Sequence, residues 1–138
     1  MKRAEVGDVT LVEDEHGIVT IDYGTAIATA ELVQDVIDRS RDLWGEERIA
    51  VLVLAESATD LAKIGAVLSL EDLADFTIAT AIVTPGKLGQ LLGNLFMKLE
   101  KSPYPQRLFT DVVVARDWLR QQIAVDQGDG KAVNQGFP

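Results

Sequence analysis

The stretch SPYPQRLFTDVVVARDWLRQQ, residues 102–122, predicts a short strand followed by a helix. Pro103 and Pro105 cannot donate hydrogen bonds to a sheet, so they end the preceding helix and lead into the run RLFT, a short strand near a sheet edge. Thr110 or Asp111 is placed to cap the helix that follows. We expect the inward side of this helix to carry Val112, Ala115, Trp118 and Leu119. This order of elements is typical of an α/β domain.

Four further strands are predicted upstream of this stretch. Val9–Glu13 and Ile18–Asp22 flank the residues DEHG and predict an antiparallel hairpin, in which Gly17 supplies a positive φ. Ile49–Ala55 and Thr77–Val83 are mainly apolar runs without polar alternation. Because strands that are covered on both faces lack such alternation, these two runs predict central, parallel strands.

Helices are predicted between these strands. The first contains apolar residues at helical spacing, with Thr25 or Thr29 as its cap and Gly45 at its end. Residues 61–75 predict a second helix, and the leucine-rich segment 84–101 predicts a third.

The predicted fold class is therefore α/β, a single domain with the element order ββαβαβαβα. Its helices pack on a mixed, mostly parallel sheet of five strands. Residues 1–8 are expected to form an N-terminal extension and residues 9–124 the domain. Residues 125–138 lack apolar periodicity and predict a flexible C-terminal tail.

The composition is that of a soluble globular protein, with 47% apolar and 25% charged residues in a chain of 138. The longest apolar run is far shorter than the roughly 20 residues that cross a bilayer, and the N-terminus lacks the apolar core of a secretory signal. Without cysteine the chain has no disulfides, thiolate nucleophiles or cysteine-ligated zinc. We expect a cytoplasmic protein without a membrane partner, and the net charge of −9 argues against nucleic-acid binding.

One segment, residues 81–110, is basic on this acidic protein, with four basic residues against one acidic residue. Within it, the residues TPGK follow a predicted parallel strand and open a helix, where free backbone N–H groups and the helix dipole attract anions. Thr84, Gly86 and Lys87 are therefore the candidate anion-binding residues, with an ordinary capped helix start as the alternative. The motif is not a P-loop, because the spacing between glycine and lysine is wrong.

Several motifs resemble the STAS domain family, and in particular its divergent branch of small bacterial proteins similar to stage II sporulation protein AA. The motifs are GNLF (Gly93–Phe96), PYP (Pro103–Pro105), LFTD (Leu108–Asp111) and WL (Trp118–Leu119). The resemblance covers about residues 9–122. It implies a STAS-like fold, and these motifs are structural, so it carries no catalytic residue over to this chain.

The better-known STAS antagonists carry a phosphorylatable serine after the central strand, in an Asp-Ser-Ser/Thr-Gly pattern. The resemblance places AKIG on that motif, and only the glycine agrees. The degenerate positions are Ala62, Lys63, Ile64 and Gly65. Ser57 and Thr59 lie upstream as displaced acceptor candidates, beside carboxylates that would repel an added phosphate. We therefore expect that this protein is not a conventional phospho-switched antagonist.

The remaining polar motifs do not indicate a specific chemistry. His16 is the single histidine and lies in the predicted hairpin turn, so we expect neither a metal site nor a Ser-His-Asp triad. Three carboxylate clusters are interpreted as solvated faces and helix-start charges: Glu13–Glu15, Glu46–Glu47 and Glu71–Asp75. Gly89 and Gly93 predict close packing of the leucine-rich helix, with a dimer contact as the alternative.

These observations favour a noncatalytic regulatory or partner-binding domain without a cofactor, acting on an unknown protein partner. The apolar composition and the leucine-rich helix predict a homodimer, with a monomer as the alternative. The alternative function is a small-molecule carrier or an enzyme that uses an apolar pocket. A pocket lined by convergent polar groups would favour that alternative, whereas an exposed apolar patch would favour partner binding.

Overall fold

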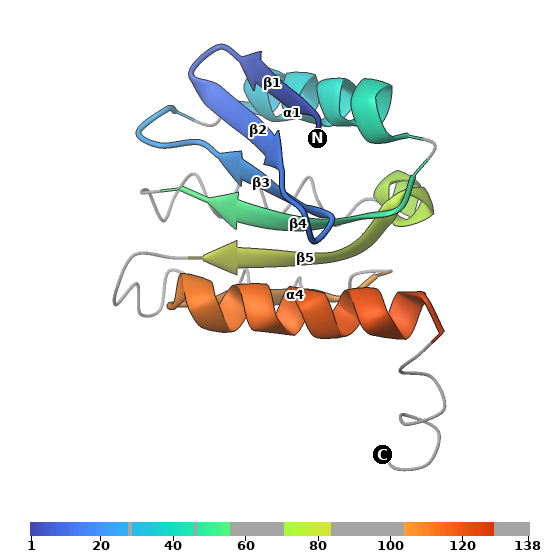
Figure 1. The fold of residues 1–138 in the computed structure, drawn as a ribbon. Coiled ribbons are helices and arrows are strands. Elements are labelled where there is room, and N and C mark those ends of the chain that lie inside the picture. The colour runs from blue at the N-terminus through green and yellow to red at the C-terminus, as the bar shows by residue number, and fades with distance from the viewer. Residues whose placement is uncertain (28, 46, 56–70, 84–103, 129–138) are drawn as a thin grey trace.

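A computed structural model describes residues 1–27, 29–45, 47–55, 71–83 and 104–128. These residues form an α/β domain with a mixed six-stranded sheet and two α-helices (Figure 1). The strands are β1 (Arg3–Val6), β2 (Val9–Glu13), β3 (Ile18–Asp22), β4 (Ile49–Leu54), β5 (Thr77–Val83) and β6 (Gln106–Phe109). The helices are α1 (Ala30–Trp44), α4 (Val112–Asp126) and the short 3₁₀ helix η1 (Glu71–Asp75).

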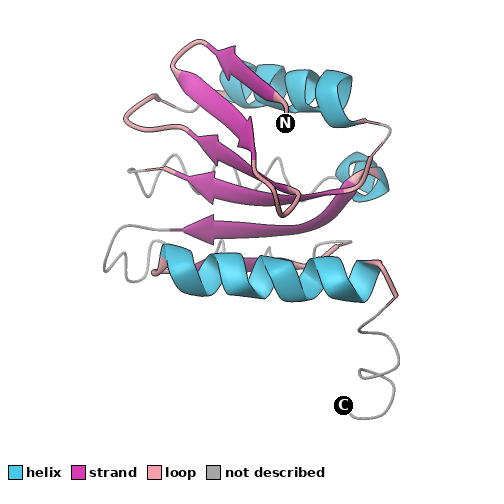
Figure 2. Cartoon of the chain, in the orientation of Figure 1, coloured by secondary structure: helices cyan, strands magenta, loops and turns pink. Residues whose placement is uncertain are grey.

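The strands lie in the sheet in the order in which they occur in the chain. The pairs β1–β2 and β2–β3 are antiparallel, and β3 to β6 are parallel to one another. The arrows of β3, β4 and β5 point the same way in Figure 2. The strands predicted as central, β4 and β5, form the middle of the parallel part, and every residue of β5 is buried. The predicted hairpin and the two central parallel strands are confirmed.

The sheet has one strand more than the five that the sequence analysis predicts. The additional strand is β1, which lies in the segment assigned to an N-terminal extension. It returns to β2 through the two residues Gly7 and Asp8, and Gly7 has the positive φ of 59° that such a tight turn needs. Periodicity did not reveal β1 because only Ala4 and Val6 of its four residues face the core.

The two α-helices cover opposite faces of the sheet (Figure 1). Strand β4 shows why its sequence does not alternate, since both of its faces are covered. One face of β4 packs with α1 through Ile49, Val51 and Val53. The other face packs with α4 through Ala50 and Leu52.

Each α-helix begins at a side-chain cap. The Thr29 hydroxyl accepts a hydrogen bond from Leu32 N at 3.1 Å, so Thr29 rather than Thr25 caps α1. The Asp111 carboxylate accepts hydrogen bonds from Val113 N at 2.7 Å and from Val114 N at 3.3 Å, so Asp111 rather than Thr110 caps α4. These caps satisfy backbone N–H groups that have no partner within the helix.

Parts of the predicted organisation lie outside the described residues. These are most of the predicted helix 61–75, the leucine-rich segment 84–101 with Gly89 and Gly93, and residues 129–138 of the predicted tail. Helix α4 extends to Asp126 and so enters the segment 125–138. None of the helices formed by the described residues combines the length and apolar character that a bilayer crossing requires.

Candidate functional site

The carboxyl ends of the parallel strands share one edge of the sheet (Figure 2), which is where open α/β sheets bind ligands. At this edge Tyr23 N donates to the Leu54 carbonyl oxygen at 2.8 Å, which joins the ends of β3 and β4. Gly24 N donates to Asp22 Oδ1 at 2.8 Å, and the φ of 54° at Gly24 allows the chain to turn away there. The Tyr23 ring is buried, and burial raises the pKa of its hydroxyl. We call this the carboxyl edge.

The candidate residues predicted from the sequence follow strands that end at the carboxyl edge. The anion-binding candidates Thr84, Gly86 and Lys87 lie beyond the end of β5 and outside the described residues. The degenerate phosphorylation-motif positions Ala62, Lys63, Ile64 and Gly65 also lie outside the described residues, as do the displaced acceptor candidates Ser57 and Thr59. The anion site and the absence of a phosphorylation switch therefore remain predictions.

The first turn of α4 exposes three consecutive valines next to the carboxyl edge. Val112, Val113 and Val114 are 40%, 67% and 53% exposed, respectively. We call these three residues the valine turn. The prediction that Val112 faces inward was wrong, although Ala115 and Leu119 of the same helix are fully buried as expected. Helical spacing places Val112 on the same side of α4 as Ala115 and Leu119. The strands β5 and β6, however, end at the paired residues Val83 and Phe109, close to the start of the helix, so Val112 lies near the end of the sheet and stays exposed.

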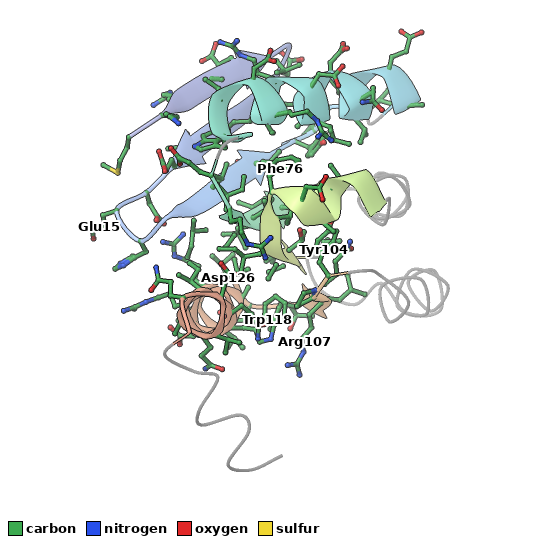
Figure 3. The ribbon with its side chains drawn as sticks, turned by 90° about the vertical axis from the view of Figure 1, so that its right-hand side faces the viewer. Glu15, Phe76, Tyr104, Arg107, Trp118 and Asp126 are labelled. Carbon is green, nitrogen blue, oxygen red and sulfur yellow. The ribbon has the colours of Figure 1, made fainter. Side chains whose placement is uncertain are left out.

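An aromatic pair continues the surface beyond the valine turn. Trp118 is four residues after Val114, so the two lie on the same side of α4. The Trp118 and Phe109 rings are tilted by 51° with their centroids 5.4 Å apart. The guanidinium of Arg107, which Figure 3 labels together with Trp118, lies 5.5 Å from the centroid of the Phe109 ring. Arg107 belongs to the basic segment, whose lysines lie outside the described residues.

The face of the sheet beneath α1 contains buried polar groups and a small cavity. Ser40, Thr77 and Thr80 line this cavity among apolar side chains, and its volume is about 20 Å³. That volume is enough for about one water molecule. Nearby, burial raises the pKa of Tyr104 to about 12, while hydrogen bonds with Thr80 and Gln106 act in the opposite direction. These hydrogen bonds link Tyr104 with Thr80 and Gln106, whereas the Ser40 hydroxyl donates to the Val36 carbonyl oxygen within α1.

His16 lies in the turn between β2 and β3, as predicted, and its side chain is exposed. A shallow surface hollow of about 230 Å³ lies beside it, lined also by Arg120, Ile123, Ala124 and Gln127. Among the described residues, no three His, Cys, Asp or Glu side chains lie close enough together to hold a metal ion.

Asp14 organises this turn and attaches it to α4. Its carboxylate accepts backbone hydrogen bonds from His16 N at 2.8 Å and Ile18 N at 3.1 Å, and it forms an ion pair with Arg116. Partial burial raises the pKa of Asp14, but the hydrogen bonds and the positive charge of Arg116 outweigh burial, so the pKa is lowered overall. The turn therefore has a structural role.

Replacing Asp14 with alanine is expected to lower the free energy of unfolding by about 1–3 kcal/mol at neutral pH, because hydrogen bonds to a charged carboxylate are lost. The pKa of Asp14 is lower in the folded state, so this stabilisation is present above the unfolded-state pKa of about 4 and is lost as the pH falls through the folded-state pKa. Urea unfolding at several pH values measures this difference, which should shrink in acid. Replacing the exposed Asp117 with alanine is the control. The expectation would be contradicted if the free energies of unfolding of the wild type and of Asp14→Ala differed by a constant amount down to about pH 3.

Comparison with known proteins identifies a family. A family model described as a domain of unknown function (DUF7793) matches residues 12–123, which is more than half of the chain. The match runs from β2 almost to the end of α4 and so includes the carboxyl edge and the valine turn. No curated protein and no solved structure matches the chain significantly.

Proposed function

Since the chain belongs to the DUF7793 family of domains of unknown function, we propose a role for it on the basis of its surface. The proposed role is that of a noncatalytic domain that binds a protein partner through the valine turn. The proposed partner covers Val112, Val113 and Val114 together with the adjoining aromatic pair. The proposed location is the cytoplasm, and the proposed role is regulatory.

The exposure of the valine turn carries this proposal. Three consecutive valines at a helix start leave apolar surface in water, and removing such surface from water is the main favourable contribution to most protein–protein association. Single exposed apolar residues are ordinary, whereas large contiguous apolar patches mark interaction surfaces. The Phe109–Trp118 pair and the exposed Arg107 add residue types that are enriched in protein interfaces.

A STAS-like identity of the domain is part of the proposal. Its support is the hairpin β2–β3 followed by parallel strands, and the position of the LFTD residues at the junction of β6 with the capped helix α4. The strand that the sequence did not predict, β1, lies before the region that the family model matches. In this scheme β1 is an addition to a STAS-like core.

The alternative of a small-molecule carrier or enzyme has less support in the described residues. The cavity beneath α1 holds about 20 Å³, whereas sites for small ligands typically hold roughly 300–1,000 Å³. Its polar lining of Ser40, Thr77 and Thr80 lies within the core, and the Ser40 hydroxyl already donates to the Val36 carbonyl oxygen at 2.8 Å. An exposed apolar turn therefore supports partner binding better than this cavity supports catalysis.

Replacing Val113 with aspartate tests the proposal. Val113 is in the first turn of α4, where a negative charge is favourable to the helix, so the variant should fold. Immobilised wild-type protein is exposed to extract of its native host, and bound proteins are quantified by mass spectrometry. We expect Val113→Asp to retain at least about tenfold less of the bound partner, because an apolar anchor is replaced by a charge.

A matched control separates this effect from a general effect of charge. Gln121→Glu adds the same charge at another exposed position of α4 and should retain the partner at the wild-type level. Equal retention by wild type, Val113→Asp and Gln121→Glu would contradict the proposed interface. So would extracts in which the wild-type protein enriches no partner.

A further inference from the structure

The outer edge of β1 offers a preformed surface for strand pairing. β1 is the terminal strand of the six-stranded sheet and lies at its margin (Figure 1). Lys2, just before the strand, is fastened by its ammonium group, which donates to the Leu43 carbonyl oxygen at 2.6 Å and to Glu47 Oε1 at 3.0 Å. Glu13 N also donates to the Lys2 carbonyl oxygen at 2.9 Å. The strand is therefore held in place before any partner arrives.

The backbone directions along β1 follow from its pairing with β2. The Lys2 carbonyl oxygen faces β2, and in an antiparallel pair the residues whose backbone groups face the neighbour alternate along the strand. The two-residue turn after Val6 leads to the same assignment of backbone directions, because it makes Val6 and Val9 a hydrogen-bonded pair. Arg3 and Glu5 consequently direct their N–H and C=O groups away from β2. In the part of the chain that the structure describes, no strand pairs with these groups.

We propose that β1 of a second copy of this chain pairs with this edge in an antiparallel arrangement centred on Ala4. In this register Arg3 of each copy lies opposite Glu5 of the other, so the outward backbone groups of both residues form hydrogen bonds between the copies. The Arg3 and Glu5 side chains are exposed on the same face, and each faces the opposite charge across the two strands. The two sheets then form one continuous sheet. This inference does not depend on the proposed function of the valine turn.

The charges select this register over its neighbours. The symmetric antiparallel register centred on Arg3 places two arginines opposite each other, and the register centred on Glu5 places two carboxylates opposite each other. Like charges directly across a strand pair are destabilising. Helix α1 packs on the face of β1 that carries Ala4 and Val6, whereas Arg3 and Glu5 are exposed on the opposite face. The helix therefore does not cover the charged side chains that would pair between the two copies.

Exchanging the two charges tests the proposal on the full chain. Sedimentation velocity at about 0.1 M salt, where ion pairs act within roughly 10 Å, measures the dimer dissociation constant. Arg3→Glu and Glu5→Arg should each weaken dimerisation at least about tenfold, because each replaces two attractive cross-strand pairs with two repulsive ones. The double variant Arg3→Glu/Glu5→Arg should restore it, and an equimolar mixture of the two single variants should form a mixed dimer.

The net charge provides an internal control. Glu5→Arg makes the acidic chain less negative, so general repulsion alone would strengthen dimerisation rather than weaken it. Both positions are exposed, and melting temperatures within a few degrees of wild type verify folding of the variants. A monomeric wild type at high micromolar concentration would overturn the proposal. So would a dimer that neither single variant weakens, or single variants that fail to pair when mixed.

Discussion

Replacing Trp44 with alanine is expected to lower the free energy of unfolding by about 3–5 kcal/mol, a large part of the roughly 5–15 kcal/mol that holds a domain folded. Trp44 is the last residue of α1 and is 0% exposed within the core beneath that helix. Its indole N–H has no hydrogen-bond partner among the described residues, so the expected loss arises from packing and the cavity that remains. Urea unfolding followed by circular dichroism measures the change.

Trp118 is the matched control for Trp44. It is partly buried at the surface of α4 and contacts Phe109, so its replacement with alanine should cost clearly less than replacement of Trp44. Equal losses for the two variants would contradict the position of Trp44 in the core.

Replacing Ala81 with leucine is expected to destabilise the domain by about 1–3 kcal/mol through overpacking. The contact between α4 and the centre of the sheet is lined by small side chains, all of them 0% exposed: Ala50, Ala79 and Ala81 of the sheet and Ala115 of α4. They allow the helix to lie close to β4 and β5, and a leucine at position 81 would have to displace it.

Ala30→Leu is the control for this substitution, because Ala30 is exposed at the start of α1 and its replacement should change stability by less than about 0.5 kcal/mol. Thermal and urea unfolding of both variants measure the difference. Unchanged stability of Ala81→Leu would show that α4 does not pack closely on β5.

The central strands were predictable from the sequence because burial on both faces imposes an apolar run, and β4 and β5 have such runs. β1 was not, since a strand of four residues with only Ala4 and Val6 turned inward has too short a pattern. The choice of Thr29 over Thr25 as the cap of α1 depends on where the helix begins, which tertiary packing decides.

The valine turn could have been recognised in part from the sequence. Three consecutive residues of a helix point in directions about 100° apart, so Val112, Val113 and Val114 cannot all face one core. Helical spacing selected Val112 as the inward residue, but all three valines are exposed because the strands end near the start of the helix. The anion-binding candidate at Thr84–Lys87 stays a prediction, because those residues lie outside the described part of the chain.

Site-specific photo-cross-linking in the native host tests partner binding by the valine turn most directly. A photoreactive amino acid replaces Val113 in one variant and Gln121, exposed further along the same helix, in the other. We predict that irradiation joins the variant labelled at position 113 to a discrete protein partner, and that position 121 gives little or no such product. No product from position 113, or equal products from both positions, would contradict the account.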